Sequence, residues 1–240
     1  MLNNFFFIAL PYVALVVFFV GTIHRYRNLK YKNSSLSSQF LEGDQLFWGT
    51  IPFHWGLIVV LLGHFMAFLI PETLLAWNAD PVRLVVLEVT GFAFAFGALI
   101  GLVILILRRL LNDRLRVVSS KMDTLLEWLL LAQIILGLVT AVQYRWGSSW
   151  FASDMSPYLW SILKLSPDTA AVVTLPMMVQ LHIIGAFLIV LLVPFTRLVH
   201  VLVAPFHYIV RPNQRVVWNW DRKSIRRPDS PWNHTPPKNN

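Results

Sequence analysis

The sequence predicts an all-α integral membrane protein, a five-transmembrane-helix bundle with its N-terminus outside and its C-terminus in the cytoplasm. Three observations lead to this prediction. Of the 240 residues, 56% are hydrophobic and 13% are charged, whereas soluble domains carry about 25% charged residues. Five apolar segments are long enough to cross about 30 Å of hydrocarbon. The basic residues gather in alternate connections between those segments.

Each predicted span has enough residues to cross a bilayer at about 1.5 Å per residue. In chain order, the spans cover about residues 5–23, 46–70, 84–107, 125–142 and 176–203. The fourth is the shortest, and Glu127 and Gln133 lie in it. Residues 1–20 lack a positively charged start and a small-residue cleavage site. We therefore interpret them as a retained span rather than a signal peptide.

The charges of the connections predict the orientation. The first connection, the third connection and the tail together carry sixteen basic residues. The second and fourth connections carry only Arg83, Arg145 and Lys164. Because cytoplasmic loops are enriched in lysine and arginine, the more basic side is predicted to be cytoplasmic. The net charge of +8 follows from this topology and does not indicate a nucleic-acid partner.

Two regions are predicted along the chain. Residues 1–210 form the membrane domain, and residues 211–240 form a basic tail rich in proline and asparagine. Such a tail is extended unless a partner binds it. The fourth connection, about residues 143–175, contains several tryptophans and is predicted to lie on the membrane surface. The chain has no cysteine, which excludes disulfides, cysteine-ligated iron–sulfur clusters and c-type haem attachment in this chain.

Four histidines lie in apolar surroundings within two of the spans. His54 and His64 belong to the second span, and His182 and His200 belong to the fifth. An ionisable residue in hydrocarbon indicates a functional site. The two spans are predicted to be antiparallel, which pairs His64 with His182 on the outer side and His54 with His200 on the inner side.

The spacing within each span does not match between the two helices. On ideal helices, the two histidines would be about 15 Å apart in the second span and about 27 Å apart in the fifth. Helix tilt, or distortion near Pro52 or Pro194, would have to absorb this difference.

Two histidine pairs at different depths suit two b-type haems, each with two axial imidazoles. The alternative is a metal or proton transport path, since chains of histidines also relay protons. Acidic residues deep in the spans are limited to Glu127 and, near a span end, Glu88. This scarcity argues against a path lined with carboxylates.

Glycines and arginines near the histidines each allow two interpretations. The glycines either give a flat macrocycle room against the backbone or allow close helix packing; they are Gly56, Gly63 and Gly185. The arginines either bind haem propionates or reflect ordinary cytoplasmic loop charge; they are Arg108, Arg109, Arg114 and Arg197. Loop charge explains most of the arginines, and Arg197, three residues before His200, is the best propionate candidate.

At these residues the chain resembles the gamma subunit of membrane-bound respiratory nitrate reductase. The resemblance extends from about residue 5 to residue 208. Its motifs are Ser37-Ser38-Gln39, Phe53-His54 through Gly63-His64, Arg108-Arg109-Leu110 with Arg114, Arg116 and Asp123, Leu181-His182 with Gly185, and Pro194-Phe195-Thr196-Arg197-Leu198-Val199-His200. The last of these motifs is the most specific.

The resemblance implies two b haems and a quinol site. His64 and His182 would bind the distal haem iron near the outer face, and His54 and His200 the proximal haem iron near the cytoplasm. The quinol site would lie beside the distal haem, near Gly63 and His64. The family has a lysine early in the third span; this sequence has none there, and Arg83 is the nearest candidate.

The implied activity is that of an oxidoreductase subunit in the prokaryotic inner (cytoplasmic) membrane. Quinol would be oxidised near the outer face, and electrons would pass through the two haems to cytoplasmic subunits. These partners would be an iron–sulfur (beta) subunit and a molybdenum-containing (alpha) subunit that reduces nitrate. This chain itself would contain neither clusters nor molybdenum. Its tail is longer than the family leads us to expect and is a candidate to contact a further partner.

Two alternatives remain open at the level of the sequence. One is a di-haem cytochrome b of another quinone-linked reductase, of the heterodisulfide- or sulfite-reductase-like kind. The Ser-Ser-Gln and Pro-Phe-Thr-Arg-Leu-Val-His motifs favour nitrate over this alternative. The other, from a different class, is a histidine-gated transporter.

Overall fold

The computed structural model describes residues 2–28, 44–117 and 119–202, which all belong to one unit, Met1–Val203. Every regular element within these ranges is helical, as predicted. The Ser37-Ser38-Gln39 motif and the tail of residues 211–240 lie outside the described residues.

Five helices in the described part of the chain are long and apolar enough to cross a membrane, which confirms the predicted class of protein. The first combines α1 (Leu2–Asn4), the π-helical turn η1 (Phe5–Ala9) and α2 (Leu10–Asn28). The next three are α3 (Asp44–Leu69), α5 (Pro81–Leu111) and α7 (Lys121–Gln143). The fifth is α11 (Met177–Leu192) with the 3₁₀ turn η3 (Val193–Phe195).

Side-chain caps set where two of these helices begin. Asp80 accepts hydrogen bonds from the backbone N–H groups of Val82 at 2.9 Å and Arg83 at 3.0 Å, and Pro81 starts α5. The N–H of Arg83 holds the pKa of Asp80 below its usual range. Ser120 and Asp123 form a reciprocal capping box at the start of α7. Both helices therefore start before the apolar residues that we used to predict them.

The fifth span differs from the predicted continuous stretch of residues 176–203. Helix α11 ends at Leu192, and the extended backbone of Thr196 (φ −116°, ψ 179°) separates η3 from the 3₁₀ helix η4 (Arg197–Leu202). Pro194 contributes to the break because proline lacks an N–H and its ring clashes with the preceding turn. His182 and His200 are therefore not on one straight helix, and the ideal spacing of about 27 Å does not apply.

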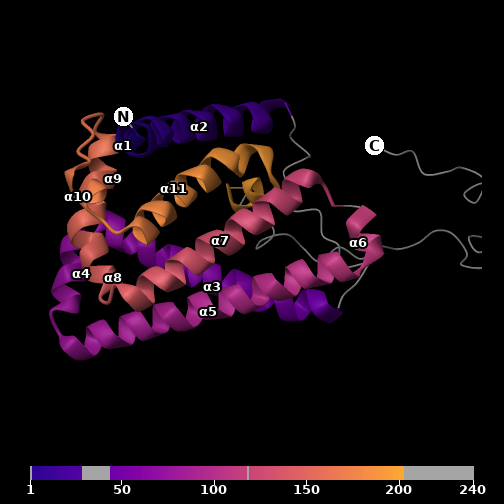
Figure 1. Ribbon diagram of the computed structural model, residues 1–240, viewed down its shortest axis with the longest axis horizontal. Coiled ribbons are helices and arrows are strands. Elements are labelled where there is room, and N and C mark those ends of the chain that lie inside the picture. The colour runs from indigo at the N-terminus through magenta and orange to yellow at the C-terminus, as the bar shows by residue number, and fades with distance from the viewer. Residues whose placement is uncertain (1, 29–43, 118, 203–240) are drawn as a thin grey trace, which may run out of the picture. The chain divides into compact units, whose positions relative to one another are not determined.

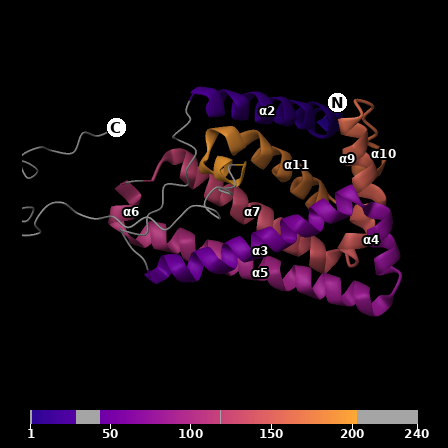
Figure 2. The ribbon, with the colours of Figure 1, turned by 180° about the vertical axis from the view of Figure 1, so that it is seen from behind.

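Helices α3 and α5 lie side by side along most of their lengths, and α11 lies between α2 and α7 (Figures 1 and 2). Glycines bring α3 and α5 together. A Cβ on Gly56 would collide with the carbonyl oxygen of Phe94, and one on Gly101 would lie 2.6 Å from the carbonyl oxygen of Gly49. Gly63 follows Gly56 by seven residues on nearly the same face, yet a Cβ there would meet nothing within 4 Å.

Short helices gather at one end of the bundle, beside the start of the chain (Figures 1 and 2). They are α4 (Pro71–Asn78), α8 (Gly147–Trp150), the π turn η2 (Phe151–Met155), α9 (Ser156–Leu163) and α10 (Ala170–Val173). We call this the cap end. The opposite end holds α6 (Asp113–Val117) and the start of α7, and we call it the basic end.

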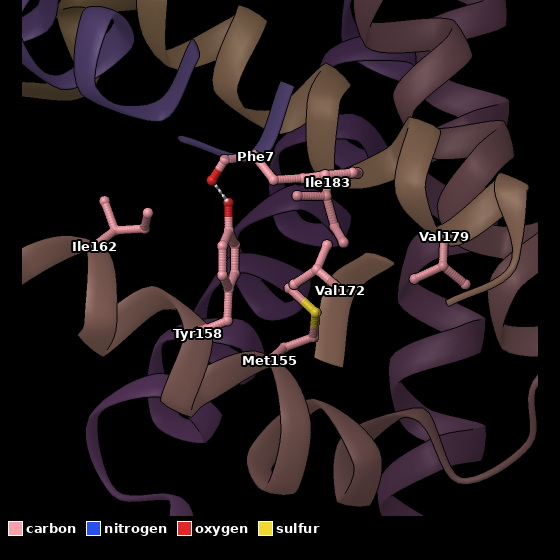
Figure 3. Close-up of a cluster of buried hydrophobic side chains, with 7 residues drawn as sticks. All are labelled: Phe7, Met155, Tyr158, Ile162, Val172, Val179 and Ile183. Atoms are coloured by element: carbon pink, nitrogen blue, oxygen red, sulfur yellow. Dashed lines mark hydrogen bonds between the residues drawn. The ribbon is translucent and has the colours of Figure 1, made fainter. Parts of the chain in front are cut away.

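The fourth connection forms a packed cap with a buried core. Figure 3 shows the Tyr158 hydroxyl pointing at the carbonyl oxygen of Phe7, to which it donates a hydrogen bond of 2.8 Å. Around it lie the other buried members of the cluster, Met155, Ile162, Val172, Val179 and Ile183. Burial raises the pKa of Tyr158. The cap therefore fastens the first and fifth spans to each other at this end.

Candidate functional site

The structure brings the four histidines of the spans into two pairs. The ring centres of His54 and His200 are 6.4 Å apart, and those of His64 and His182 are 6.5 Å apart. Each pair takes one ring from α3 and one from the fifth span. The His64–His182 pair lies nearer the cap end, where the ring of Phe151 meets His64 edge to face at 5.3 Å.

Three of the four rings are hydrogen-bonded to a carbonyl oxygen one turn earlier in their own helix. The Nδ1 of His54 lies 2.9 Å from the carbonyl oxygen of Thr50, and the Nδ1 of His64 lies 2.7 Å from the carbonyl oxygen of Val60. The Nδ1 of His200 lies 2.6 Å from the carbonyl oxygen of Arg197. Since a carbonyl can only accept, Nδ1 is the donor in each neutral ring. The other ring nitrogen, Nε2, then carries the free lone pair and can bind a metal.

The distances between the ring centres suit a metal ion held between two imidazoles. Metal–nitrogen bonds of about 2 Å to two opposed rings would put the ring centres about 6 to 6.5 Å apart. No group of three or more metal-ligating side chains occurs within the described ranges. Within those ranges each pair offers two imidazole ligands, so a metal ion held between them would need a further group to fill its remaining coordination positions. A planar macrocycle such as haem fits this requirement.

Comparison with known proteins identifies the family. The model of the nitrate reductase gamma subunit family matches residues 3–219. The chain belongs to this family. It is 35% identical over 206 residues to the nitrate reductase gamma chain of Bacillus subtilis (strain 168), covering 84% of this chain and 92% of that protein.

Two further relatives come from Escherichia coli (strain K12). The respiratory nitrate reductase 2 gamma chain is 34% identical over 221 residues, or 90% of this chain and 96% of the relative. The respiratory nitrate reductase 1 gamma chain is 31% identical over 230 residues, which cover 90% of this chain and 97% of the relative. Together with the five apolar helices, the family makes this chain a multi-pass membrane subunit of a nitrate reductase, an oxidoreductase complex.

The predicted propionate-binding arginines have carboxylate partners in two cases. In this gamma-family chain, Arg197 Nε lies 2.9 Å from Asp123, and Arg109 Nη2 lies 3.1 Å from Glu127. Arg108 is buried in the last turn of α5, with 5% of its surface exposed, and the side chain of Arg114 lies outside the described residues. A propionate at Arg197 or Arg109 would have to share the guanidinium with a carboxylate of α7.

Arg83, the predicted quinol-site residue, lies nearer the cap end than His64 does. Its guanidinium covers the ring of Trp77, with Cζ 4.9 Å from the ring centre. Because Gly49 packs against Leu105 and Phe53 against Gly101, His64 is level with about residue 90 of α5. Arg83 is therefore displaced by about 10 Å along the helix.

The glycines near the histidines have different surroundings. Gly56 lies against α5, and a Cβ on Gly185 would collide with Gln133 Oε1, so close packing explains both. Gly63, next to His64, faces open space. The structure thus separates the two interpretations that the sequence left open, because of these three glycines only Gly63 has room for a flat macrocycle beside it.

Sequence reasoning missed three residues that act on the fifth span. Arg25 Nη1 donates to the carbonyl oxygens of Pro194 at 2.8 Å and Thr196 at 2.9 Å. Gln133 Nε2 donates to the carbonyl oxygen of His182 at 2.9 Å, and Gly137 lies against the His182 ring. A glutamine inside an apolar span was a usable signal for Gln133, since buried polar groups require partners.

Proposed function

We propose that the chain is the quinol-oxidising, di-haem cytochrome b subunit of a respiratory nitrate reductase. His64 and His182 bind one b haem, and His54 and His200 bind the other. One observation carries the proposal: two histidine pairs, each joining α3 to the fifth span, have ring centres 6.4 and 6.5 Å apart. Membership of the nitrate reductase gamma subunit family supports it and favours nitrate as the terminal acceptor of the complex.

A haem held by two histidines carries single electrons, so two haems at different depths would join the two sides of the membrane. The residues of the chain prepare this route. The carbonyl oxygens of Thr50 and Val60 hold the rings of His54 and His64 by Nδ1 and leave Nε2 to bind iron. The apolar spans exclude water from the histidine pairs. The residues around each pair would therefore set the reduction potential of the haem bound there.

Quinol is oxidised on the cap side of the His64–His182 pair. The open space at Gly63 adjoins His64, where a flat apolar ring can approach the helix backbone. Oxidation to the quinone releases two electrons and two protons, and the protons leave at the cap end. Arg83, with its guanidinium over Trp77, stands closer to the membrane surface and is our candidate for guiding quinol to this space.

The orientation follows from charge. The described basic end carries Arg27, Arg109, Arg116 and Lys121, so it faces the cytoplasm of a prokaryotic cell, and the cap end faces outward. The iron–sulfur (beta) subunit and the molybdenum-containing (alpha) subunit, which reduces nitrate, bind at the cytoplasmic side. The tail of residues 211–240 is a candidate contact for a further partner.

Haem analysis of the purified protein tests the proposal. We expect two b haems per chain by reducible absorbance and pyridine haemochrome. His64→Ala and His182→Ala should remove the same haem, and His54→Ala and His200→Ala the other. His24→Ala is the control, because His24 contacts Asn28 at 3.0 Å on the surface; it should retain both haems. A folded protein without haem would overturn the proposal and leave the histidine-gated transporter.

The soluble partner decides between nitrate reductase and another quinone-linked reductase. Purification from the native membrane under mild detergent should recover a molybdenum subunit with quinol-dependent nitrate reduction. Recovery of a different reductase with the same two haems would retain the haem assignment and reject nitrate.

A further inference from the structure

His182 differs from the other three histidines in what holds its ring. The Nδ1 of His182 is buried and has no hydrogen-bond partner among the described residues, whereas the other three rings are bonded to their own helix. An imidazole without such a bond can rotate about its side-chain torsions unless packing restrains it. The restraint at His182 comes from α7.

Gly137 provides the contact with the ring. A Cβ built on Gly137 would lie 3.0 Å from Cε1 of His182 and 3.7 Å from both ring nitrogens. Because Cε1 lies between the two nitrogens, this edge of the ring points at the backbone of α7. The ring therefore cannot swing toward α7, and any side chain at position 137 would push it away.

Gln133 holds the backbone that carries the ring. It lies one turn before Gly137 on the same face of α7, and its Nε2 donates to the carbonyl oxygen of His182 at 2.9 Å. Its Oε1 occupies the space left by Gly185 in α11. This hydrogen bond and the steric fit together set how far α11 is rotated and shifted against α7 at His182.

We propose that Gln133 and Gly137 are positioning residues for the metal-binding geometry of His182. They act through His182 on the His64–His182 pair, whose rings are inclined at 44°. The His54–His200 pair, with an inclination of 57°, does not depend on them. The inference rests on the proposed haem function, because it assigns what orients one of the two histidines that would hold the cap-side haem.

Gly137→Ala tests the ring contact, with Gly97→Ala as the control. A Cβ on Gly97 meets nothing within 4 Å, so the control makes the same substitution in another span without a collision. Low-spin haem signals in electron paramagnetic resonance depend on the angle between the imidazole planes. We expect Gly137→Ala to shift the signal and midpoint potential of one haem only, or to weaken retention of that haem about 10-fold.

Gln133→Met tests the hydrogen bond, because methionine has nearly the same length and shape but cannot donate. Gln143→Met, at the exposed end of the same helix, is the matched control. The expected result is a shift of the same haem that Gly137→Ala affects, with the other haem unchanged. The affected haem should be the one that His64→Ala removes.

The outcomes separate the two proposals. Wild-type protein without haem would reject the proposed function. Two normal haems with unchanged signals and potentials in both Gly137→Ala and Gln133→Met would reject this inference alone. Equal shifts of both haems would also reject it, because a general loosening of the bundle would not distinguish the two pairs.

Discussion

The second and fifth spans each supply one histidine to each pair, but they position them differently. Helix α3 remains continuous through Pro52, and each of its two histidines is hydrogen-bonded to a carbonyl one turn earlier. The fifth span breaks after α11 and is held from outside by Arg25, Gln133 and Asp123. The α3 ring of each pair is thus set by local helix geometry. The segments that carry the two rings of the fifth span are held by contacts between distant parts of the chain, and the ring of His200 also bonds to the carbonyl oxygen of Arg197 in its own helix.

This comparison predicts that substitutions beside the fifth span disturb the haems more than substitutions beside α3. Arg25→Ala should have the largest effect, because it leaves the carbonyl oxygens of Pro194 and Thr196 without the guanidinium. An unsatisfied buried polar group costs about 1–3 kcal/mol. The haem of the His54–His200 pair should be lost preferentially, measured by haem content and by thermal unfolding in detergent. Arg27→Ala, exposed on the same helix, should behave as wild type.

Two glycines of α3 provide the next prediction. Gly56→Ala places a Cβ against the Phe94 carbonyl, and overpacking of this kind costs about 1–3 kcal/mol; the thermal midpoint should fall. Gly63→Ala should leave that midpoint unchanged, because the position is open, but it should slow quinol oxidation assayed with a soluble electron acceptor. Equal stability and equal activity of the two variants would contradict the inference that Gly56 is packed against α5 while Gly63 borders open space.

Asp123 takes part in two interactions, the capping box at the start of α7 and the ion pair with Arg197. Asp123→Asn retains a side-chain oxygen that can accept from the backbone N–H of Ser120 but weakens the ion pair, whereas Asp123→Ala also loses this half of the capping box, with Ser120 still capping the helix. We expect Asp123→Asn to shift the potential of the His200 haem with little change in stability. Asp123→Ala should in addition lower the melting temperature. An unchanged potential of the His200 haem in Asp123→Asn would show that the ion pair does not matter, and equal melting temperatures of the two variants would show that the cap contact of Asp123 does not.

The smallest effect is expected at Tyr158 in the cap, whose hydroxyl bonds to the first span and not to α3 or the fifth span. Burial raises the pKa of Tyr158, so the folded state retains the phenolic proton that the unfolded chain releases above about pH 10. Stability should therefore fall as the pH rises above that value. Tyr158→Phe should be less stable at neutral pH, since the Phe7 carbonyl loses its donor, and should show a weaker decline at high pH. Melting curves of the wild type and of Tyr158→Phe between about pH 8 and about pH 11 would measure how stability depends on pH in each.

Part of the site could be read from the chain because it depends on local properties. Hydropathy and length predicted the spans. Topology alone matched His64 with His182 and His54 with His200, the same rings that lie 6.5 and 6.4 Å apart. Depth in a membrane is nearly one-dimensional, so residue number along a span is sufficient to estimate it.

Other features required the tertiary structure, because they depend on residues far apart in sequence. Arg25 reaches Pro194 across 169 positions, and Gln133 reaches His182 across 49. No periodicity connects such pairs. The different surroundings of Gly56, Gly63 and Gly185 likewise depend on which helix lies opposite each of them.

The sequence by itself therefore determined the class of protein, the number of spans and which histidines pair, since apolar length and residue order carry that information. Only the tertiary structure decided how the fifth span reaches its partner. The break at Thr196 replaces the straight helix on which the two histidines would be about 27 Å apart. That break is held by groups on other helices, because a backbone interrupted in hydrocarbon must find hydrogen-bond partners beyond its own helix.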